Sequence, residues 1–432
     1  MRDVIFISLE NWDGVWRRNQ FLCAEWLQRF PAMRLLFVGR TKDVSNAART
    51  ASREGLRRPT FEKSREFKGL SFLNPFKLLP NSFSLGRGIN LRLLERQIRS
   101  AVKKAGLRSP LLWINDHCGE PLVGRLNERA VVYDITDDWT LMPAVGEEER
   151  ELIRKWDARL CAKADLVVVC SRALERSRRG LCRKIITVPN GVDAAHYRSC
   201  LEPPKQALDQ DQARVPVFGY LGTLHGDRLD LELVEELARA RPEAKVVLCG
   251  PDQLTGTERK RLRAQPNVQL LAQVHYKSVP RIIAGFDVCI LPHRCTPFTE
   301  SLNPIKLWEY LASGKPVAAT PVAGFRERAH LCHLGAGRDG FLAACDEALR
   351  EDGSRWPARL REAEANSWKA RSEQLLEVFR QHGWLGRPIP KPRRARVGGV
   401  AGSGAGTTES KLGETKGDSV WGGQSSLCET IL

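Results

Sequence analysis

Residues 302–321 read LNPIKLWEYLASGKPVAATP and predict a short helix followed directly by a buried strand. Asn303 suits the helix N-cap, and Pro304 suits the first helical position. Gly314 is typical of the left-handed residue that ends a helix, and a proline follows shortly after it. The run 317–320 is almost entirely apolar, which favours a strand inside a parallel sheet. This stretch is therefore one helix–strand unit of an α/β protein.

Similar units extend on both sides of this stretch. Strands are predicted over 4–8, 34–39, 111–115, 131–135, 166–170 and 184–188, and then over 215–221, 245–249, 268–271, 287–291 and 317–320. Helical patterns separate many of them, at 15–30, 92–105, 147–162, 229–240, 279–284 and 304–313. Near-continuous apolar strands that alternate with helices indicate parallel sheets covered on both faces. The prediction is two doubly wound α/β domains with a ligand cleft between them.

Composition divides the chain further. Residues 1–200 form the first predicted domain, and the polar, Pro-containing stretch 201–214 reads as a linker. Residues 215–350 form the second domain, and 351–385 contain a long helical pattern that is expected to return to the first domain. Residues 386–432 are rich in Pro, Arg, Gly, Ser and Thr and have almost no core-forming residues, so a disordered tail is predicted.

The charge and cysteine content restrict the class of protein. The chain has 432 residues, a net charge of +17 and 12 cysteines without any C-x-x-C pair. Metal-ligand spacings are therefore missing, and cysteines inside apolar runs suit a reducing cytosol. No apolar stretch approaches the length of a membrane span, and the N-terminus reads as a strand, not as a signal peptide. No motif for binding nucleic acid accompanies the positive charge.

The positive charge is concentrated in residues 51–110, which hold 14 Lys and Arg against 4 Asp and Glu. The same region contains the apolar segment LSFLNPFKLLP (70–80). Basic and apolar residues together predict contact with an anionic membrane surface, in which Lys63, Lys68, Lys77 and Arg87 would take part. The alternative is a solvated surface with an irregular loop.

Lys306 stands at the third position of the predicted helix, where the helix dipole favours acidic residues. A helix start is a ready phosphate site, because its first backbone N–H groups lack partners. Glu309 lies one turn further on the same face, and its carboxylate can accept hydrogen bonds from two ribose hydroxyls. Phosphate and ribose at this spacing describe a nucleotide diphosphate. The alternative is an ordinary surface Lys–Glu pair, which is common and weak.

Several segments resemble GT-B glycosyltransferases, specifically the retaining family 4 and its polysaccharide-biosynthesis relatives. The signature is carried by FDVCILP (286–292) and LNPIKLWEYLASGKPVAAT (302–320). Other similar segments occur in the expected order: ADLVVVCS (164–171), VPNGVD (188–193), GYLGTLHGDRLDLELVEELA (219–238) and NVQLLAQVHYKSVPRII (267–283). The resemblance implies two Rossmann-like domains, with the acceptor bound by the first and the nucleotide sugar by the second.

The resemblance also implies a donor site in the second domain. Glu309 would bind the ribose, while Lys306, Arg228 and helix-start amides would hold the diphosphate and stabilise it as it leaves. The remaining donor-binding residues that it implies are Gly14, Gly222, Thr223, Glu300, Asn303, Pro304 and Ile305. The chain departs from the family pattern at three of these positions. Thr223 replaces a customary Arg, Arg228 replaces a Lys, and Glu300 lies one residue further from Glu309 than the usual acid.

The first domain offers candidates for the acceptor side of the cleft. Arg17 follows the first predicted strand and could serve the donor or an acidic acceptor, or form the outer face of its helix. His117 follows the strand 111–115 and resembles a catalytic histidine of the family; the alternative is a structural histidine. Asp137 and Asp138 follow the strand 131–135, where they would bind acceptor hydroxyls, hold a metal, or cap the next turn. No metal and no cofactor are predicted.

The sequence thus predicts a glycosyltransferase that moves a sugar from a nucleotide diphosphate to a glycan or lipid-linked acceptor, with retention. The predicted setting is envelope or extracellular polysaccharide synthesis, in the cytoplasm or peripherally on the inner face of the membrane. Two alternatives remain open: a non-hydrolysing nucleotide-sugar epimerase, and a non-catalytic GT-B binding protein.

Overall fold

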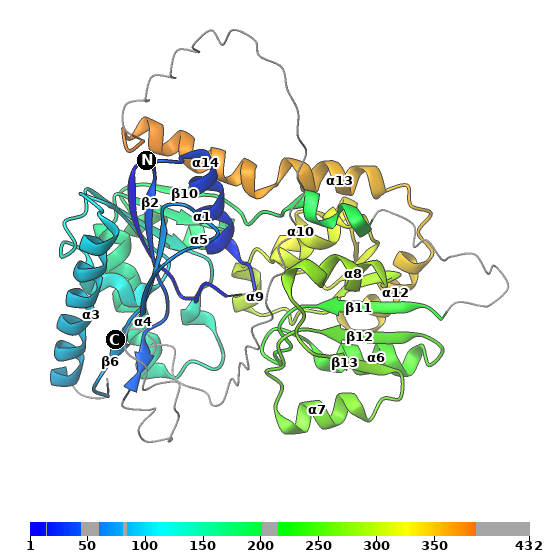
Figure 1. Ribbon diagram of the computed structural model, residues 1–432. Helices are drawn as coiled ribbons and strands as arrows, with labels where there is room; N and C mark the ends of the chain where they lie inside the picture. Colours follow the sequence, from blue (N-terminus) through cyan, green and yellow to red (C-terminus); the bar gives the residue numbers. More distant parts are fainter. Residues whose placement is uncertain (14, 45–59, 81–83, 201–214, 386–432) are drawn as a thin grey trace, which may run out of the picture.

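The computed structural model describes residues 1–13, 15–44, 60–80, 84–200 and 215–385, and Figure 1 shows them as two sheet domains side by side. The predicted linker 201–214 and the predicted disordered tail 386–432 lie outside the described residues. None of the described helices combines the length and the apolar composition that a membrane span requires.

The N-terminal sheet has the strand order β10-β9-β8-β7-β1-β2-β5-β4, and its neighbouring strands are parallel except for the edge pair β4–β5. Its strands are β1 (Asp3–Ile7), β2 (Arg34–Val38), β4 (Thr60–Lys63), β5 (Leu70–Asn74), β7 (Leu111–Ile114), β8 (Ala130–Ile135), β9 (Leu166–Val169) and β10 (Ile185–Thr187). Two short strands, β3 (Lys42–Asp43) and β6 (Phe76–Lys77), pair with each other in parallel.

The C-terminal sheet has the order β13-β12-β11-β14-β15-β16 and is parallel throughout. Its strands are β11 (Val217–Leu221), β12 (Lys245–Cys249), β13 (Val268–Leu271), β14 (Val288–Leu291), β15 (Val317–Ala319) and β16 (His333–Leu334). β11 and β14 are the two neighbouring strands at the centre of this sheet. Both are almost entirely buried, which explains their continuous apolar sequences.

Both sheets reverse direction next to their first strand. The chain builds outward from β1 through β2 and β5, then returns to add β7 to β10 on the other side. The second sheet repeats this plan around β11. The carboxyl ends of β1 and β7, and of β11 and β14, are thus topological switch points, where open α/β sheets bind ligands. The predicted fold class, two doubly wound parallel-sheet domains, is confirmed.

Helices cover both sheets. The N-terminal domain contains α1 (Arg18–Arg29), α3 (Ser84–Ala105), α4 (Glu147–Lys163) and α5 (Arg172–Arg178). The C-terminal domain contains α6 (Leu231–Ala240), α7 (Gly256–Arg263), α8 (Val279–Ala284), α9 (Pro297–Ser301), α10 (Ile305–Ala312), α11 (Ala323–Arg326) and α12 (Gly337–Leu349). The chain ends with α13 (Trp356–Ala365) and α14 (Trp368–Gln381), which run along both domains in Figure 1.

Much of the segment 70–80, which was predicted to contact a membrane, lies in strands β5 and β6. Residues Leu70–Asn74 form β5, which pairs with β2 on one side and β4 on the other. Lys77 is 1% exposed and its ammonium lies 3.3 Å from the carboxylate of Asp43, so this lysine cannot reach a membrane. The apolar residues of β5 were misread because they pack within the sheet, whereas Leu78 near the end of the segment is 47% exposed.

The chain crosses between the domains at two adjacent places. Val192, Tyr197 and Cys200 pack into the C-terminal core, so the predicted domain boundary at residue 200 is too late. The return crossing lies between α13 and α14. There, Val192 N–H donates to the carbonyl of Asn366 over 3.2 Å, and Trp368 N–H donates to the carbonyl of Val192 over 3.1 Å.

The returning helix α14 packs on α1 of the N-terminal domain. Trp368 stacks on Phe21 with ring centroids 5.0 Å apart. Phe379 is fully buried, with its ring centroid 6.1 Å from that of Trp26 and 6.2 Å from that of Trp113. The N-terminal core is therefore completed by the last described helix of the chain.

Replacing Phe379 with alanine should lower the stability of the N-terminal domain by about 3–5 kcal/mol, because it leaves a cavity between Trp26 and Trp113. Urea denaturation followed by tryptophan fluorescence measures this loss. The control is Glu377→Ala on the same helix, whose side chain is 54% exposed. Equal urea midpoints for the two variants would show that the packing of α14 contributes nothing.

Candidate active site

The turn after β11 lies at the C-terminal switch point and is held by close backbone contacts. Gly222 N–H donates to the carbonyl of Cys249 over 2.9 Å. Gly250 has φ +151°, and a Cβ added there would lie 2.0 Å from the Gly222 oxygen. The hydroxyl of Tyr220 donates to the carbonyl of Thr223 over 3.3 Å. The backbone of the predicted donor-binding loop, which contains Gly222 and Thr223, is therefore held in one conformation.

Arg228 follows this loop and reaches the other domain. Its Nη2 lies 3.3 Å from Oδ1 of Asp137, which follows β8 in the N-terminal domain. Its guanidinium also lies over the ring of Phe298 in α9, 5.2 Å from the centroid. The two residues predicted for the diphosphate and for the acceptor are thus brought together across the junction of the two domains.

Helix α10 begins one residue later than predicted, at Ile305, with Pro304 as its N-cap. Asn303 does not cap it. Instead, Oδ1 of Asn303 accepts hydrogen bonds from the backbone N–H of Asn190 over 2.9 Å and from Nε1 of Trp308 over 3.2 Å. No side chain caps α10, and its first turn has no acidic residue. The start of the helix therefore keeps its positive end without a side-chain counter-charge.

Lys306 faces Glu309 across one turn of α10. Its Nζ lies 2.7 Å from Oε2 of Glu309. The partners differ in burial, since the side chain of Lys306 is 29% exposed and that of Glu309 is 5% exposed. Burial and the nearby Glu309 carboxylate raise the pKa of Tyr197 above its ordinary value. The ion pair that the sequence left as an alternative is present, but it joins a partly exposed cation to a buried acid.

Two neighbours of Lys306 make other contacts. Ile305 is partly buried and packs against the core of the N-terminal domain. Glu300 lies in α9, and its carboxylate oxygens accept hydrogen bonds from both terminal nitrogens of Arg326, over 2.9 and 2.6 Å. The carboxylate expected beside the donor sugar is therefore engaged in an ion pair with Arg326, the last residue of α11.

Arg17 lies at the start of α1, after the carboxyl end of β1. Its Nε is 3.2 Å from Oε1 of Glu10, and its Nη1 is 3.7 Å from Oδ1 of Asp13. Burial raises the pKa of Glu10 to about 6, although Arg17 opposes the shift. Gly14, predicted to approach the donor, lies outside the described residues. Arg17 thus belongs to a mixed-charge group on the N-terminal side of the domain junction.

Asp137 and Asp138 are adjacent but play different parts. Asp137 is 19% exposed and faces Arg228. Asp138 is buried and pairs with Arg178, and its Oδ1 caps the turn through Thr140 N–H at 3.2 Å. Although burial opposes it, hydrogen bonding from Arg178 holds the pKa of Asp138 below its usual range. Both carboxylate oxygens of Asp138 thus serve its own domain, which supports the turn-capping alternative over the predicted acceptor role.

His117 is 3% exposed and its ring lies 6.3 Å from that of Trp156. This burial supports the structural alternative over the predicted catalytic role. Asp116, His117 and Cys118 also have potential ligand atoms within 4.8 Å of one another. Oδ1 of Asp116 already accepts a hydrogen bond from Cys118 N–H over 2.9 Å, as the cap of a 3₁₀ turn.

Arg18, Ser171 and Asn190 lie close to the candidate site but are not among the predicted site residues. Arg18 of α1 is buried and forms an ion pair with Asp134 of β8. Ser171 and Asn190 form hydrogen bonds with the loop before α10. Ser171 and Asn190 lie in segments that resemble the family, ADLVVVCS and VPNGVD. Nothing in their local sequence indicates that their partners lie in the opposite domain, whereas Arg18 pairs within its own domain.

Comparisons with known proteins show which proteins this chain is similar to. Residues 215–352 match the family described as Glycosyl transferases group 1. The putative teichuronic acid biosynthesis glycosyltransferase TuaH of Bacillus subtilis (strain 168) is 26% identical over 277 residues, which span 60% of this chain and 69% of TuaH.

Solved structures show the same fold. Sucrose-phosphate synthase from Thermosynechococcus elongatus superimposes with a TM-score of 0.65 at 17% identity, over 88% of this chain and 99% of its own. Anabaena HepE in complex with UDP-glucose superimposes with a TM-score of 0.59 at 16% identity, over 88% of this chain and 100% of its own. The fold is GT-B-like, residues 215–352 form a glycosyltransferase group 1 domain, and the chain is a glycosyltransferase.

Replacing Gly250 with alanine should destabilise the C-terminal domain by about 3 kcal/mol or more, because the added Cβ collides with the Gly222 backbone. Thermal unfolding measures the effect. The control Gly256→Ala should be neutral or slightly stabilising, since a Cβ there meets nothing within 4 Å. A normal unfolding temperature for Gly250→Ala would mean that the β11 loop is not fixed by this contact.

Proposed function

We propose that the protein transfers a sugar from a nucleotide diphosphate to a glycan or lipid-linked acceptor during synthesis of an envelope or extracellular polysaccharide, with retention at the anomeric carbon. The observation that carries the proposal is the start of α10. Its backbone N–H groups have no side-chain cap, a lysine stands in the first turn, and a buried acid lies one turn further. TuaH, named for teichuronic acid biosynthesis, and HepE with UDP-glucose support the substrate class.

In the proposed donor complex, Lys306 and Glu309 no longer pair with each other, and each binds a different part of the donor. Diphosphate oxygens at the helix start would take over Lys306, because two negative charges near a positive helix end attract it more than one carboxylate. The freed Glu309 carboxylate would accept hydrogen bonds from the ribose hydroxyls. Before the donor binds, Lys306 thus occupies the carboxylate of Glu309.

Arg228 is placed to stabilise the leaving diphosphate. Its contact with Asp137 at 3.3 Å is long for a charge-assisted hydrogen bond, and the arginine side chain is 37% exposed. A diphosphate would offer the guanidinium two oxygens in bidentate geometry. Asp137 would then be free to bind an acceptor hydroxyl. The residues of this chain mainly orient the reactants and stabilise charge, which suits a reaction with a diphosphate leaving group.

An experiment with a panel of nucleotide sugars tests the proposed function. The protein is incubated with UDP-, GDP- and ADP-sugars, and the products are separated by chromatography. A transferase should release the nucleoside diphosphate. An epimerised nucleotide sugar would favour the epimerase alternative, and binding without any product would favour a non-catalytic protein.

Lys306→Ala should weaken binding of the nucleoside diphosphate by about 1.5–3 kcal/mol, because it removes a charge-assisted hydrogen bond. Calorimetric titration measures the affinity. The matched control is Lys260→Ala, an exposed lysine of α7 in the same domain. Unchanged affinity for Lys306→Ala would reduce Lys306 to a structural partner of Glu309.

Glu309→Gln should lose affinity for the ribonucleotide far more than for its 2′-deoxy analogue, because the proposed carboxylate partner is the ribose. Each affinity is measured by the same titration, against the wild-type ratio for the two nucleotides. Equal losses for both nucleotides would remove the ribose assignment and leave Glu309 as an anchor for Lys306.

We also propose that the N-terminal domain associates with anionic membranes, so that a lipid-linked acceptor can reach the site. Helix α3 lies on the outer side of that domain, away from the C-terminal domain (Figure 1). It exposes Leu85 by 70% and Ile89 by 40%, beside Leu78 at 47%. The helix has one acidic residue, Glu95, among six basic ones: Arg87, Arg92, Arg96, Arg99, Lys103 and Lys104.

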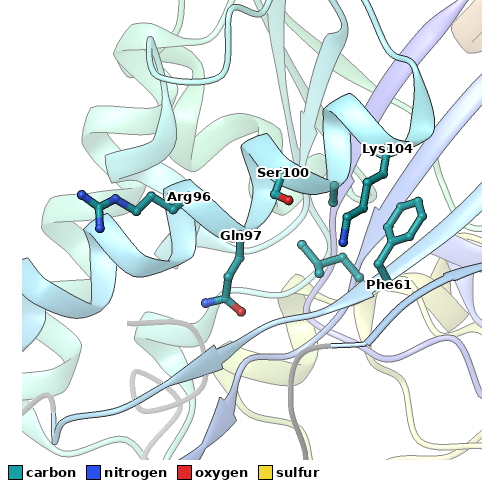
Figure 2. A pocket seen from close by; sticks show the side chains of 7 residues that line it. Phe61, Arg96, Gln97, Ser100 and Lys104 are labelled. Carbon is teal, nitrogen blue, oxygen red and sulfur yellow. The ribbon is translucent and has the colours of Figure 1, made fainter.

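A small pocket adds to this surface. Figure 2 shows Arg96 and Lys104 of α3 on either side of Ser100, with Phe61 of β4 beside Lys104. The pocket has a volume of ≈ 220 Å³, and the ammonium of Lys104 lies 5.7 Å from the Phe61 ring centroid. Cations beside apolar side chains suit the boundary between lipid head groups and acyl chains.

The combined variant Arg92→Ser, Arg96→Ser, Lys103→Ser and Lys104→Ser should lose binding to anionic liposomes, which sedimentation measures at low and physiological salt. Each basic residue near such a surface contributes about 1 kcal/mol at most, and salt screens it. The control replaces the four basic residues of α7 (Arg259, Lys260, Arg261 and Arg263), a basic helix of the other domain. If wild-type protein ignores anionic liposomes at low salt, a soluble acceptor is the better proposal.

A further inference from the structure

The loop between α9 and α10 is held by the opposite domain. The hydroxyl of Ser171, at the N-cap of α5, donates to the carbonyl of Ser301 over 2.6 Å. Asn190 makes two contacts with Asn303: its backbone N–H donates to Oδ1 over 2.9 Å, and its Nδ2 donates to the carbonyl over 2.6 Å. Three hydrogen bonds from the N-terminal domain therefore reach the residues just before α10.

The side-chain amide of Asn190 has only one possible orientation. Its Oδ1 lies 3.3 Å from Nη1 of Arg18, and a guanidinium can only donate. Nδ2 must therefore point to the carbonyl of Asn303. Asn190 is 7% exposed, and its own carbonyl accepts a hydrogen bond from Nε of Arg371 over 3.2 Å. Asn190 is therefore held in place by Arg18 and Arg371, independently of its contact with the other domain.

Asn303 connects Asn190 to helix α10. Its Oδ1 also accepts the hydrogen bond from Nε1 of Trp308, on the second turn of α10. Pro304, between Asn303 and the helix, has a ring that fixes its φ and so transmits the direction of the chain. The direction of the first turn of α10, and with it the position of Lys306, follows from where Asn190 lies.

We propose that Asn190 is a positioning residue for the donor diphosphate, acting through Asn303 without touching the donor. The inference rests on the proposed function, in which the diphosphate binds at the start of α10. Since Asn190 belongs to the N-terminal domain, the diphosphate site is complete only while the two domains are in contact. Ser171 supports the same loop through Ser301.

The decisive variant is Asn190→Asp. It has the same shape and keeps an oxygen for Arg18, but it puts an acceptor where Nδ2 donated to Asn303. The wild-type protein is first tested for binding of UDP, GDP and ADP. Affinity for the nucleotide that it binds should fall about five- to twentyfold in the variant, as measured by calorimetry. In the donor assay, KM for the nucleotide sugar should rise by a similar factor while kcat falls less.

Two further comparisons separate positioning from general damage. Asn303→Ala should weaken nucleotide binding, and the double variant Asn190→Asp/Asn303→Ala should bind no more weakly than the poorer single variant, because both act through one contact. Ser171→Ala should also weaken binding. Its control is Ser177→Ala on the same helix, whose hydroxyl donates to the helix carbonyls of Ala173 and Leu174.

The outcomes distinguish the inference from the function on which it rests. If the wild-type protein binds none of the three nucleotides, the proposed function fails. If it binds one, but Asn190→Asp and Ser171→Ala bind as tightly as wild type, the positioning role is wrong. A lowered unfolding temperature with unchanged KM in Asn190→Asp would also overturn it, in favour of a purely structural role.

Discussion

A buried ion pair between Arg18 and Asp134 fixes the part of the molecule on which the site depends. Nε and Nη2 of the arginine lie 2.9 and 3.0 Å from the two carboxylate oxygens, and the side chains are 3% and 0% exposed. Burial raises the pKa of Asp134, and Arg18 opposes the shift. Loss of either partner would strand a buried charge, at a cost on the order of 3–5 kcal/mol. The pair locks α1, β8 and the segment after β10 into one arrangement, since Arg18 also donates to the carbonyl of Val188 over 2.9 Å.

The fold was largely readable from the sequence because parallel strands buried on both faces leave continuous apolar runs. β12 and β13 have the predicted bounds, and the other predicted strands differ by one or two residues at an end. β5 was missed because it lies among basic residues, and its apolar side chains looked like a surface feature. Helix α9 was missed because five residues provide too little periodicity. The break between α13 and α14 was missed because the long helical pattern continues across it.

The site was predictable only where its contacts are local. The spacing of Lys306 and Glu309 within one helix already places them on one face, and the structure has them 2.7 Å apart. The bond between Arg228 and Asp137 joins residues 91 positions apart, so no local pattern reveals it. Asn303 shows the limit most clearly. Its type and position suit a helix cap, but a partner 113 residues away competes for the same oxygen and takes it.

The paired crossings of the chain determine how the two domains can move. Because Val192 bonds to both Asn366 and Trp368, the outgoing and returning chains form one joint and not two separate tethers. A Cβ at Gly191 would lie 3.0 Å from the carbonyl of Asn366, so the two chains are closely packed at the joint. A joint held by two such hydrogen bonds would favour rotation of one domain about it over sliding of the two chains past each other. Opening and reclosing would then bring the same atoms back to the same partners each time, so that domain closure would be reproducible.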